Sequence, residues 1–205
     1  MTTAVIAGVG PGLGASLAHR FTAEGCDVGL FARSAGVLDD IAADLQEAKG
    51  DALAVPTDIT DPEAVAAGFE RVRDAFGPVD VLVNNASSAA WKGTLDIGRE
   101  EFRRSLEVGV ESALYCVQEA VPDMLDGDGG TVVFTGATTA VRGREGAIGF
   151  SANKFAARGM AESMARELGP EGIHVAHVVI DGGILPEDDV GSEEYLDPDA
   201  IADSY

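Results

Sequence analysis

The sequence predicts an α/β fold in which a parallel sheet is covered by helices on both faces. Six short apolar runs alternate with segments of helical periodicity along the 205 residues. The runs lack the alternation of apolar and polar residues that is typical of strands with one solvent-exposed face. Both faces of the sheet are therefore expected to be buried. A glycine-rich turn after the first run opens the first helix, which is typical of dinucleotide-binding α/β domains.

The predicted strands are residues 3–8, 27–32, 51–56, 79–84, 130–136 and 174–180. The clearest helix follows the third strand, where Asp61 is a suitable N-cap and Pro62 suits the first helical position. Its apolar stripe is Val65, Phe69, Val72 and Phe76. Gly77 and Pro78 then end it. Further helices are expected over 99–125 and 151–168.

The composition indicates one globular domain with an unusual charge. Hydrophobic residues make up 46%, while 35 acidic and 14 basic residues give a net charge of −21. Such a charge argues against binding to nucleic acid or to an anionic membrane surface. The acids are dispersed, which favours adaptation to molar salt, where repulsion is screened. The alternative is a merely acidic protein from an ordinary environment.

Targeting and metal signals are lacking in the sequence. No apolar run is long enough to cross a bilayer, and the first residues do not form a signal peptide. Cys26 and Cys116 lie in different segments without metal-ligand spacing, so they are expected to be reduced core residues of a cytoplasmic protein. No metal site is expected.

The glycine-rich turn predicts a phosphate-binding loop. It reads Gly8-Val9-Gly10-Pro11-Gly12-Leu13-Gly14. Glycines allow backbone N–H groups to approach a pyrophosphate, whose charge the following helix N-terminus stabilises. The alternative is that the glycines serve the turn alone.

The end of the second strand favours NADP over NAD. NAD sites usually carry a carboxylate there, which binds the ribose 2′-hydroxyl. This chain has Ala32 followed by Arg33, and a guanidinium suits a 2′-phosphate. The alternative is that Arg33 is an ordinary surface residue.

Together these features resemble the short-chain dehydrogenase/reductase family, over nearly the whole chain. The spaced glycines match, as do Asp58 in Thr57-Asp58-Ile59-Thr60 and the motif Asn84-Asn85-Ala86-Ser87. Phe150-Ser151-Ala152-Asn153-Lys154 falls where the family has Tyr-x-x-x-Lys. The resemblance implies a Rossmann-type, doubly wound sheet with strand order 3-2-1-4-5-6. Its implied cofactor contacts are Gly8, Gly10, Gly12, Leu13, Gly14, Arg33, Asp58, Ile59, Asn84, Ala86, Lys154 and Gly182.

The catalytic half of the family pattern is largely missing. In the family, the lysine binds the nicotinamide ribose and lowers the pKa of a catalytic tyrosine. Here Lys154 remains, but Phe150 replaces the tyrosine, Ala137 the serine and Gly109 the asparagine. The lysine therefore keeps its ribose-binding role and loses its partner in proton transfer. The alternative is that Lys154 extends from an apolar helix to solvent.

Several groups are candidates to replace the missing proton donor. Asp181 stands where the family has proline beside the nicotinamide, and Thr138 and His177 lie nearby in the chain. Water is a fourth candidate. Each side chain has a structural alternative: Thr138 satisfying local backbone groups, His177 hydrogen-bonded in the core, and Asp181 binding the cofactor amide.

Two functions follow from this mixed pattern. The first is an NADP-dependent oxidoreductase with a changed proton donor, acting on a small carbonyl compound or alcohol. The second is a cofactor-binding sensor or regulatory subunit without turnover.

The C-terminal residues differ from the rest. Residues 1–185 are expected to form the dinucleotide-binding domain, and 186–205 an acidic loop and short helix of a substrate lid, with Trp91 and Lys92 on its other side. The family's seventh strand is missing, which leaves the sixth strand as an open edge. By resemblance we expect a homodimer or larger homo-oligomer through helices 99–125 and 151–168.

Overall fold

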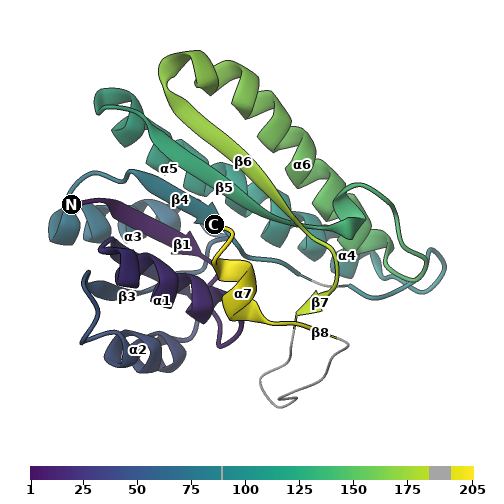
Figure 1. Cartoon of the computed structure of the whole chain (residues 1–205). Coiled ribbons are helices and arrows are strands. Elements are labelled where there is room, and N and C mark those ends of the chain that lie inside the picture. Colours follow the sequence, from purple (N-terminus) through teal and green to yellow (C-terminus); the bar gives the residue numbers. More distant parts are fainter. Residues whose placement is uncertain (89, 185–194) are drawn as a thin grey trace.

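The computed structural model describes residues 1–88, 90–184 and 195–205, and its centre is a six-stranded parallel sheet (Figure 1). The strands are β1 (Thr3–Ala7), β2 (Asp27–Ala32), β3 (Ala52–Pro56), β4 (Val81–Asn84), β5 (Gly130–Ala137) and β6 (Ile173–Ile180). Their order is β3-β2-β1-β4-β5-β6. The predicted fold class and strand order are therefore confirmed. Among the described residues, no further strand joins this sheet.

Helices cover both faces of the sheet. The α-helices are α1 (Leu13–Glu24), α2 (Ala35–Asp44), α3 (Pro62–Phe76), α4 (Arg99–Leu106), α5 (Ser112–Asp126), α6 (Ile148–Leu168) and α7 (Pro198–Ala202). One apolar cluster joins the sheet to α3, α5 and α6, and a second joins it to α1, α2 and α7. The three-layer arrangement is the one expected for strands that are apolar on both sides.

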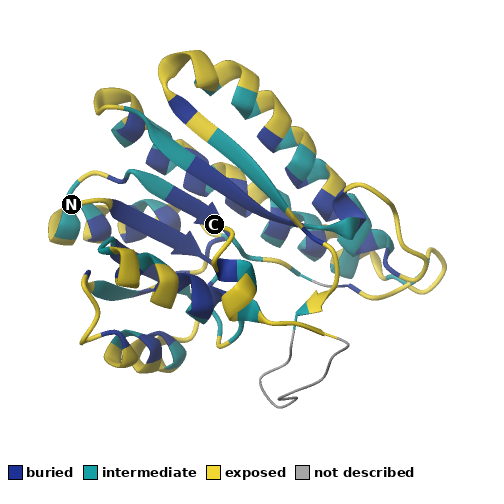
Figure 2. Cartoon of the chain, in the orientation of Figure 1, coloured by how far each residue is buried: buried dark blue, intermediate teal, exposed yellow. Residues whose placement is uncertain are grey.

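The first strand shows how the sequence builds this core. All five residues of β1 are buried, so the strand is dark blue over its length in Figure 2. Val5 and Ala7 belong to the cluster under α3 and α5, and Ala4 and Ile6 to the cluster under α1 and α2. Successive side chains of a strand point to opposite faces, which explains why a continuous apolar run fits here.

Local signals set the helix ends as expected for α3. The Asp61 carboxylate accepts hydrogen bonds from the N–H groups of Glu63 at 3.0 Å and Ala64 at 3.4 Å. Val65 and Phe69 are fully buried. The N-cap, the stripe and the stop at Gly77 are all confirmed.

The long helix expected over 99–125 is interrupted. Between α4 and α5, residues Glu107–Glu111 form a π-helix, and the Ser112 hydroxyl donates to the Val108 carbonyl at 2.6 Å. A π-bulge inserts one residue into a helix and is common at functional sites. The residue at its centre is Gly109, which the resemblance to the family predicts to stand where the asparagine usually lies.

The C-terminal part packs on the domain. Residues Gly183–Ile184 (β7) pair with Tyr195–Leu196 (β8) in a separate small sheet. The expected short helix is α7, capped by Asp197, whose carboxylate accepts from the Asp199 N–H at 2.9 Å. Ala202 of α7 is buried beside α1. Most of the expected lid, residues 185–194, lies outside the described part of the chain.

Two further expectations can be checked on the described residues. Cys26 and Cys116 are free thiols, as expected, but only Cys116 is a buried core residue, whereas Cys26 is half-buried. Burial raises the pKa of Cys116 to about 12. None of the described helices is both long and apolar enough to cross a membrane.

Candidate active site

A large cavity opens at the carboxyl ends of the parallel strands. Its volume is about 1340 Å³, and the loops after β1, β2, β3, β4, β5 and β6 all line it. Ligands of open α/β sheets bind at this edge, at the point where the strand order reverses, here between β1 and β4. The volume exceeds the roughly 300–1,000 Å³ of ordinary small-molecule pockets. It is large enough for a dinucleotide together with a substrate.

The glycine loop has the shape that a pyrophosphate needs. Gly8 has φ +104°, and a side chain there would collide with the backbone of Ala86. A Cβ at Gly14 would lie 2.8 Å from the Cα of Val9. Gly10 and Gly12, in contrast, have no neighbouring atom within 4 Å of an added Cβ. The tight glycines shape the turn, and the open ones leave room for a ligand beside the backbone.

The start of α1 offers two backbone donors to an anion. Gly12 is the N-cap and has no side chain that could cap the helix, and the Ala15 N–H already donates to the Gly10 and Gly12 carbonyls. The N–H groups of Leu13 and Gly14 have no acceptor among the described residues, and together with the helix dipole they favour a negatively charged ligand. The residues present therefore fit a dinucleotide pyrophosphate.

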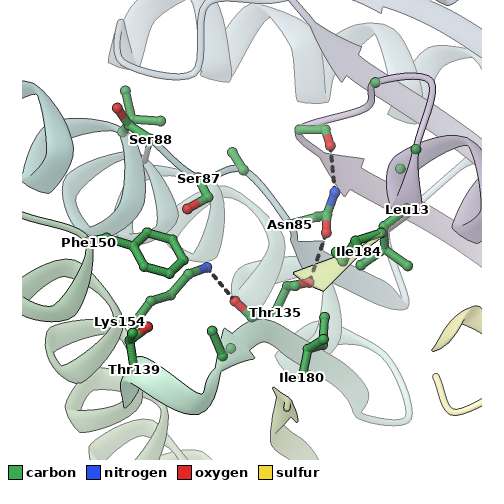
Figure 3. A pocket seen from close by; sticks show the side chains of 18 of the residues that line it. Leu13, Asn85, Ser87, Ser88, Thr135, Thr139, Phe150, Lys154, Ile180 and Ile184 are labelled. Atoms are coloured by element: carbon green, nitrogen blue, oxygen red, sulfur yellow. Dashed lines mark hydrogen bonds between the residues drawn. The ribbon is translucent and has the colours of Figure 1, made fainter. Parts of the chain in front are cut away.

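A chain of hydrogen bonds ties this loop to β5, as Figure 3 shows, and continues from β5 to the C-terminal segment. The Asn85 amide donates to the Gly8 carbonyl at 2.7 Å, and Asn85 Oδ1 accepts from the Thr135 hydroxyl at 3.0 Å. The Tyr205 hydroxyl lies 2.8 Å from Thr135 Oγ1. Because Thr135 gives its hydrogen to Asn85, Tyr205 is the donor. Sequence reasoning missed Tyr205, because no local pattern pairs residues so far apart.

The two asparagines of the motif face different spaces. Asn85 lines the main cavity, whereas Asn84, one of the expected cofactor contacts, lines a small cavity of about 10 Å³ beside Lys154. The Asn84 Nδ2 is buried and has no hydrogen-bond partner among the described residues. Ile59 and Ala86, also expected contacts, line both cavities.

Charged side chains gather at the end of the cavity near β2 and β3. Arg33 is exposed and lines it beside Asp58, Ile59 and Thr60. The Asp58 carboxylate accepts hydrogen bonds from the Thr60 hydroxyl at 2.7 Å and from its N–H at 3.1 Å. These bonds, with smaller contributions from Arg104 and Arg33, lower the pKa of Asp58. Asp58 is thus an ionised acceptor at neutral pH.

Lys154 is a buried cation and does not extend to solvent. Its side chain comes from α6, the residue is 4% exposed, and Nζ donates to the Thr135 carbonyl at 2.8 Å. Burial lowers the pKa of Lys154 to about 8. The solvent-directed alternative is therefore wrong. The ammonium stands at the cavity wall, and only one of its three hydrogens has an acceptor among the described residues.

Phe150 belongs to a stack of aromatic rings and cations. The Lys154 Nζ lies 5.6 Å from the centre of the Phe150 ring, on which the Trp91 ring packs at 4.9 Å between centroids. The Arg144 guanidinium lies 5.2 Å from the centre of the Trp91 ring. Both ends of the stack therefore carry a cation–π contact. The phenylalanine in place of tyrosine is a packed element of the cavity wall.

The space of a side chain at position 109 is already filled. A Cβ on Gly109 would collide with the Asn153 amide. Asn153 is 1% exposed, and its Nδ2 donates to the Ser105 carbonyl at 2.9 Å, while Oδ1 has no donor among the described residues. Sequence reasoning missed this contact between Gly109 and the Asn153 amide, because the two residues lie on different helices.

Two of the candidate proton donors meet in the cavity. The Thr138 hydroxyl donates to Asp181 Oδ1 at 2.6 Å, and the Ile180 carbonyl at 3.4 Å is the weaker acceptor. Both residues line the cavity with Lys154, and Asp181 is exposed. The main acceptor of the Thr138 hydroxyl is therefore the Asp181 carboxylate, and not a local backbone carbonyl. Ala137 also lines the cavity and brings no polar group.

Other expected residues lie apart from this pair. His177 does not line the cavity, and its Nε2 is buried without a partner among the described residues, so it is not the hydrogen-bonded core residue expected. Burial and nearby Lys154 lower the pKa of His177.

Trp91 and Gly182 line the cavity, but Lys92 instead pairs with Glu101 at 2.8 Å. Within the described ranges, no three metal-ligating side chains cluster.

Comparisons with known proteins agree with this geometry. A family model described as short chain dehydrogenase matches residues 2–185. The 3alpha-hydroxysteroid dehydrogenase of Mediterraneibacter gnavus is 30% identical over 175 residues, which cover 84% of this chain and 70% of that protein.

Two similar solved structures are complexes with NADPH or an NADP derivative. L-sorbose reductase from Gluconobacter frateurii, complexed with NADPH and L-sorbose, has a TM-score of 0.91 at 26% identity, covering 99% of this chain and 87% of that one. Alcohol dehydrogenase from the archaeon Thermococcus sibiricus, complexed with 5-hydroxy-NADP, has a TM-score of 0.85 at 27% identity, covering 100% and 88%.

Proposed function

Because this chain belongs to the short-chain dehydrogenase family, we propose that it is an NADP(H)-dependent oxidoreductase acting on a small carbonyl compound or alcohol. One observation carries the proposal: a single cavity joins the open glycine loop to buried Lys154 and the Thr138–Asp181 pair. The fold alone would not suffice, because similar folds host unrelated functions.

The preference for NADP rests on the end of β2. Arg33 lines the cavity where a ribose 2′-substituent is usually bound, and the carboxyl end of β2, Leu30 to Ala32, carries no carboxylate that would compete with it. The two solved relatives contain NADPH and 5-hydroxy-NADP, which supports the same choice. Asp58, Ile59 and Ala86 would line the adenosine side, and Gly182 the nicotinamide side.

The chain's own residues would manage binding and the proton. A bound nicotinamide supplies or accepts the hydride. Lys154 would donate hydrogen bonds to the adjoining ribose, because its free hydrogens are at the cavity wall. In the oxidation of an alcohol, Thr138 Oγ1 would accept the substrate proton and pass its own hydrogen to Asp181. Reduction would reverse these transfers, and exposed Asp181 would exchange its proton with water.

The first test is cofactor binding followed by turnover. We expect NADPH to bind more tightly than NADH in a fluorescence titration in molar KCl, and Lys154→Met to weaken NADPH binding at least tenfold. Turnover on a carbonyl panel should fall roughly 100-fold in Asp181→Asn, the usual range for general acid–base groups. Thr138→Val should fall similarly. Absence of binding to either cofactor would refute the function, and unchanged turnover in Asp181→Asn would refute the relay.

A cofactor-binding protein without turnover is the second candidate. Phe150, Ala137 and Gly109 all stand where the family carries catalytic groups, which is the observation in its favour. The relatives named above are dehydrogenases and reductases, which favours turnover. The variant Phe150→Tyr with Ala137→Ser distinguishes the two. If that variant reduces generic carbonyl compounds while the parent protein reduces none, the parent is a cofactor-binding protein that lacks turnover.

The proposed assembly is a homodimer through α4, α5 and α6. Leu114 of α5 is 39% exposed and Phe155 of α6 is 46% exposed. Both helices cover the same face of the sheet (Figure 1). Exposed apolar side chains on adjacent helices suit an interface between two copies.

A further inference from the structure

The basic residues of this acidic chain are paired with carboxylates more often outside the main cavity than along its lining. Outside the main cavity, most have a carboxylate within 4 Å, namely Arg20, Arg73, Lys92, Arg103, Arg158 and Arg166. Among the basic residues that line the cavity, only Arg104 has one. Arg33, Arg142, Arg144 and Lys154 have no such partner among the described residues. In a chain with 35 acids, this arrangement requires an explanation.

Two of these unpaired cations stand at the reacting end of the cavity. Arg142 and Arg144 belong to the loop after β5, whose backbone is held by bonds from the Arg142 N–H to the Thr138 carbonyl at 2.9 Å and from the Arg144 N–H to the Ser151 hydroxyl at 3.2 Å. Arg144 also stacks on Trp91. Both residues are exposed and line the cavity, and Arg144 lies against the Trp91 ring that packs on Phe150.

Arg142 and Arg144 are too far from Arg33 to share its ligand group. Arg33 follows β2, and β1 and β4 separate β2 from β5. At about 4.8 Å per strand, the two ends of the cavity are roughly 14 Å apart. A 2′-phosphate bound at Arg33 would therefore leave Arg142 and Arg144 for a second negatively charged group.

The surrounding charges favour binding of an anion at this end. Glu145 and Asp181 also line it, but neither lies within ion-pair distance of the two arginines, and Asp181 accepts from Thr138. A guanidinium binds carboxylate or phosphate with two parallel hydrogen bonds. Elsewhere the net charge of −21 repels anions, so two arginines that have no carboxylate partner in the described part of the chain create a local exception.

We propose that the substrate carries an anionic group, a carboxylate or a phosphate, which Arg142 and Arg144 bind while its carbonyl or alcohol carbon lies at Thr138 and Lys154. The placement of the reacting carbon at Thr138 and Lys154 rests on the proposed function. The binding of the anionic group does not, because it depends only on the two arginines and on Trp91.

The test uses Trp91, which is the chain's one tryptophan and therefore reports directly on this end of the cavity. Binding is followed by tryptophan fluorescence with NADPH present and ionic strength held constant. The first pair of probes is 4-oxopentanoate and its methyl ester. The second pair is dihydroxyacetone phosphate and dihydroxyacetone. The two pairs distinguish a carboxylate ligand from a phosphate ligand.

We expect the charged member of one pair to bind at least roughly tenfold more tightly than its neutral partner, as charge-assisted hydrogen bonds would give. The double variant Arg142→Gln with Arg144→Gln should reduce the difference to within about twofold. Arg99→Gln is the control, because Arg99 is exposed, outside the cavity and also without an ion pair among the described residues. It should leave the difference unchanged.

Turnover is followed separately by absorbance of NADPH. A charge preference that depends on the arginines, without oxidation of NADPH, would support the anion site and refute the proposed function. Equal binding within both pairs, or a preference that the double variant keeps, would overturn the anion site even if NADPH is oxidised.

Discussion

At the scale of single residues, Lys154 is the group of the candidate site whose burial is hardest to explain without a ligand. A buried ammonium is destabilising unless it is paired, and this one has a single carbonyl acceptor among the described residues. The chain nevertheless places it at the cavity wall, next to a ring that cannot exchange a proton. This is consistent with binding of a ribose as the role that remains.

The depressed pKa of Lys154 predicts how stability depends on pH. Burial lowers the pKa from 10.5 to about 8. Below pH 8 both the folded and the unfolded states are protonated, so the folded state carries the full desolvation penalty. Between pH 8 and 10.5 the unfolded state binds more protons, so stability rises with pH. The shift corresponds to about 3 kcal/mol, less about 1 kcal/mol for the hydrogen bond to Thr135.

Lys154→Met should therefore be more stable than the parent by roughly 2 kcal/mol near pH 7, and this advantage should vanish by pH 10.5. Urea unfolding of the cofactor-free protein across this range measures the difference. Arg158→Met, at a half-buried position one turn later on α6, is the matched control and should show no such trend. Parallel stability curves for Lys154→Met and the parent would contradict the assignment of a buried charge.

At the scale of elements, the π-helix between α4 and α5 and the asparagine of α6 form one fitted unit. Gly109 leaves space, and the Asn153 amide fills it and holds the Ser105 carbonyl. Restoring the family asparagine at position 109 is therefore blocked by α6. The Asn153 amide therefore occupies the space that a side chain at position 109 would need.

This fit predicts a strong coupling between the two positions. Gly109→Ala should destabilise the protein by about 1–3 kcal/mol, as overpacking does. Adding Asn153→Ala should recover much of that loss, because it removes the colliding amide. A double-mutant cycle by thermal or urea unfolding measures the coupling. Additive effects of the two changes would show that the helices adjust without contact between these positions. Gly159→Ala, on the open side of α6, is the control and should be tolerated.

The elements that could be predicted are those with local signals. Asp61 and Pro62 start α3, glycines mark the turn between β1 and α1, and continuous apolar runs mark the strands. The π-helix, the Asn153 amide and the bond from Tyr205 to Thr135 have no such signal, because each depends on residues brought together by folding. Arg142 and Arg144 were missed for the same reason: only the structure reveals that both line the cavity without a carboxylate partner among the described residues.

At the scale of the whole molecule, the charge predicts a dependence on salt. The exposed ion pairs contribute only about 0–1 kcal/mol each, and salt weakens them. Repulsion from a net charge of −21 acts in the opposite sense, and its range falls from about 10 Å to about 3 Å between 0.1 M and 1 M salt. We expect the repulsion to dominate.

The melting temperature should rise by roughly 5–10 °C between 0.1 M and 2 M KCl, corresponding to a few kcal/mol for a domain of this size. Scanning calorimetry measures the change. Sucrose is the control for general exclusion from the surface, since it adds no ions. A flat response to KCl would mean that the chain is merely acidic and not adapted to molar salt.

The last prediction concerns assembly, because the same acidic surface must allow two copies to meet. Light scattering in 2 M KCl should give the mass of a dimer, twice 21.1 kDa. Leu114→Glu with Phe155→Glu should give a monomer, because burying two unpaired carboxylates in an interface is strongly unfavourable. Leu95→Glu, at a position that is 97% exposed before α4, is the control and should remain dimeric. A parent protein that is monomeric would refute the dimer. A dimer that survives the double change would place the contact elsewhere, with β6, which pairs only with β5 in the described part of the sheet, as the next surface to test.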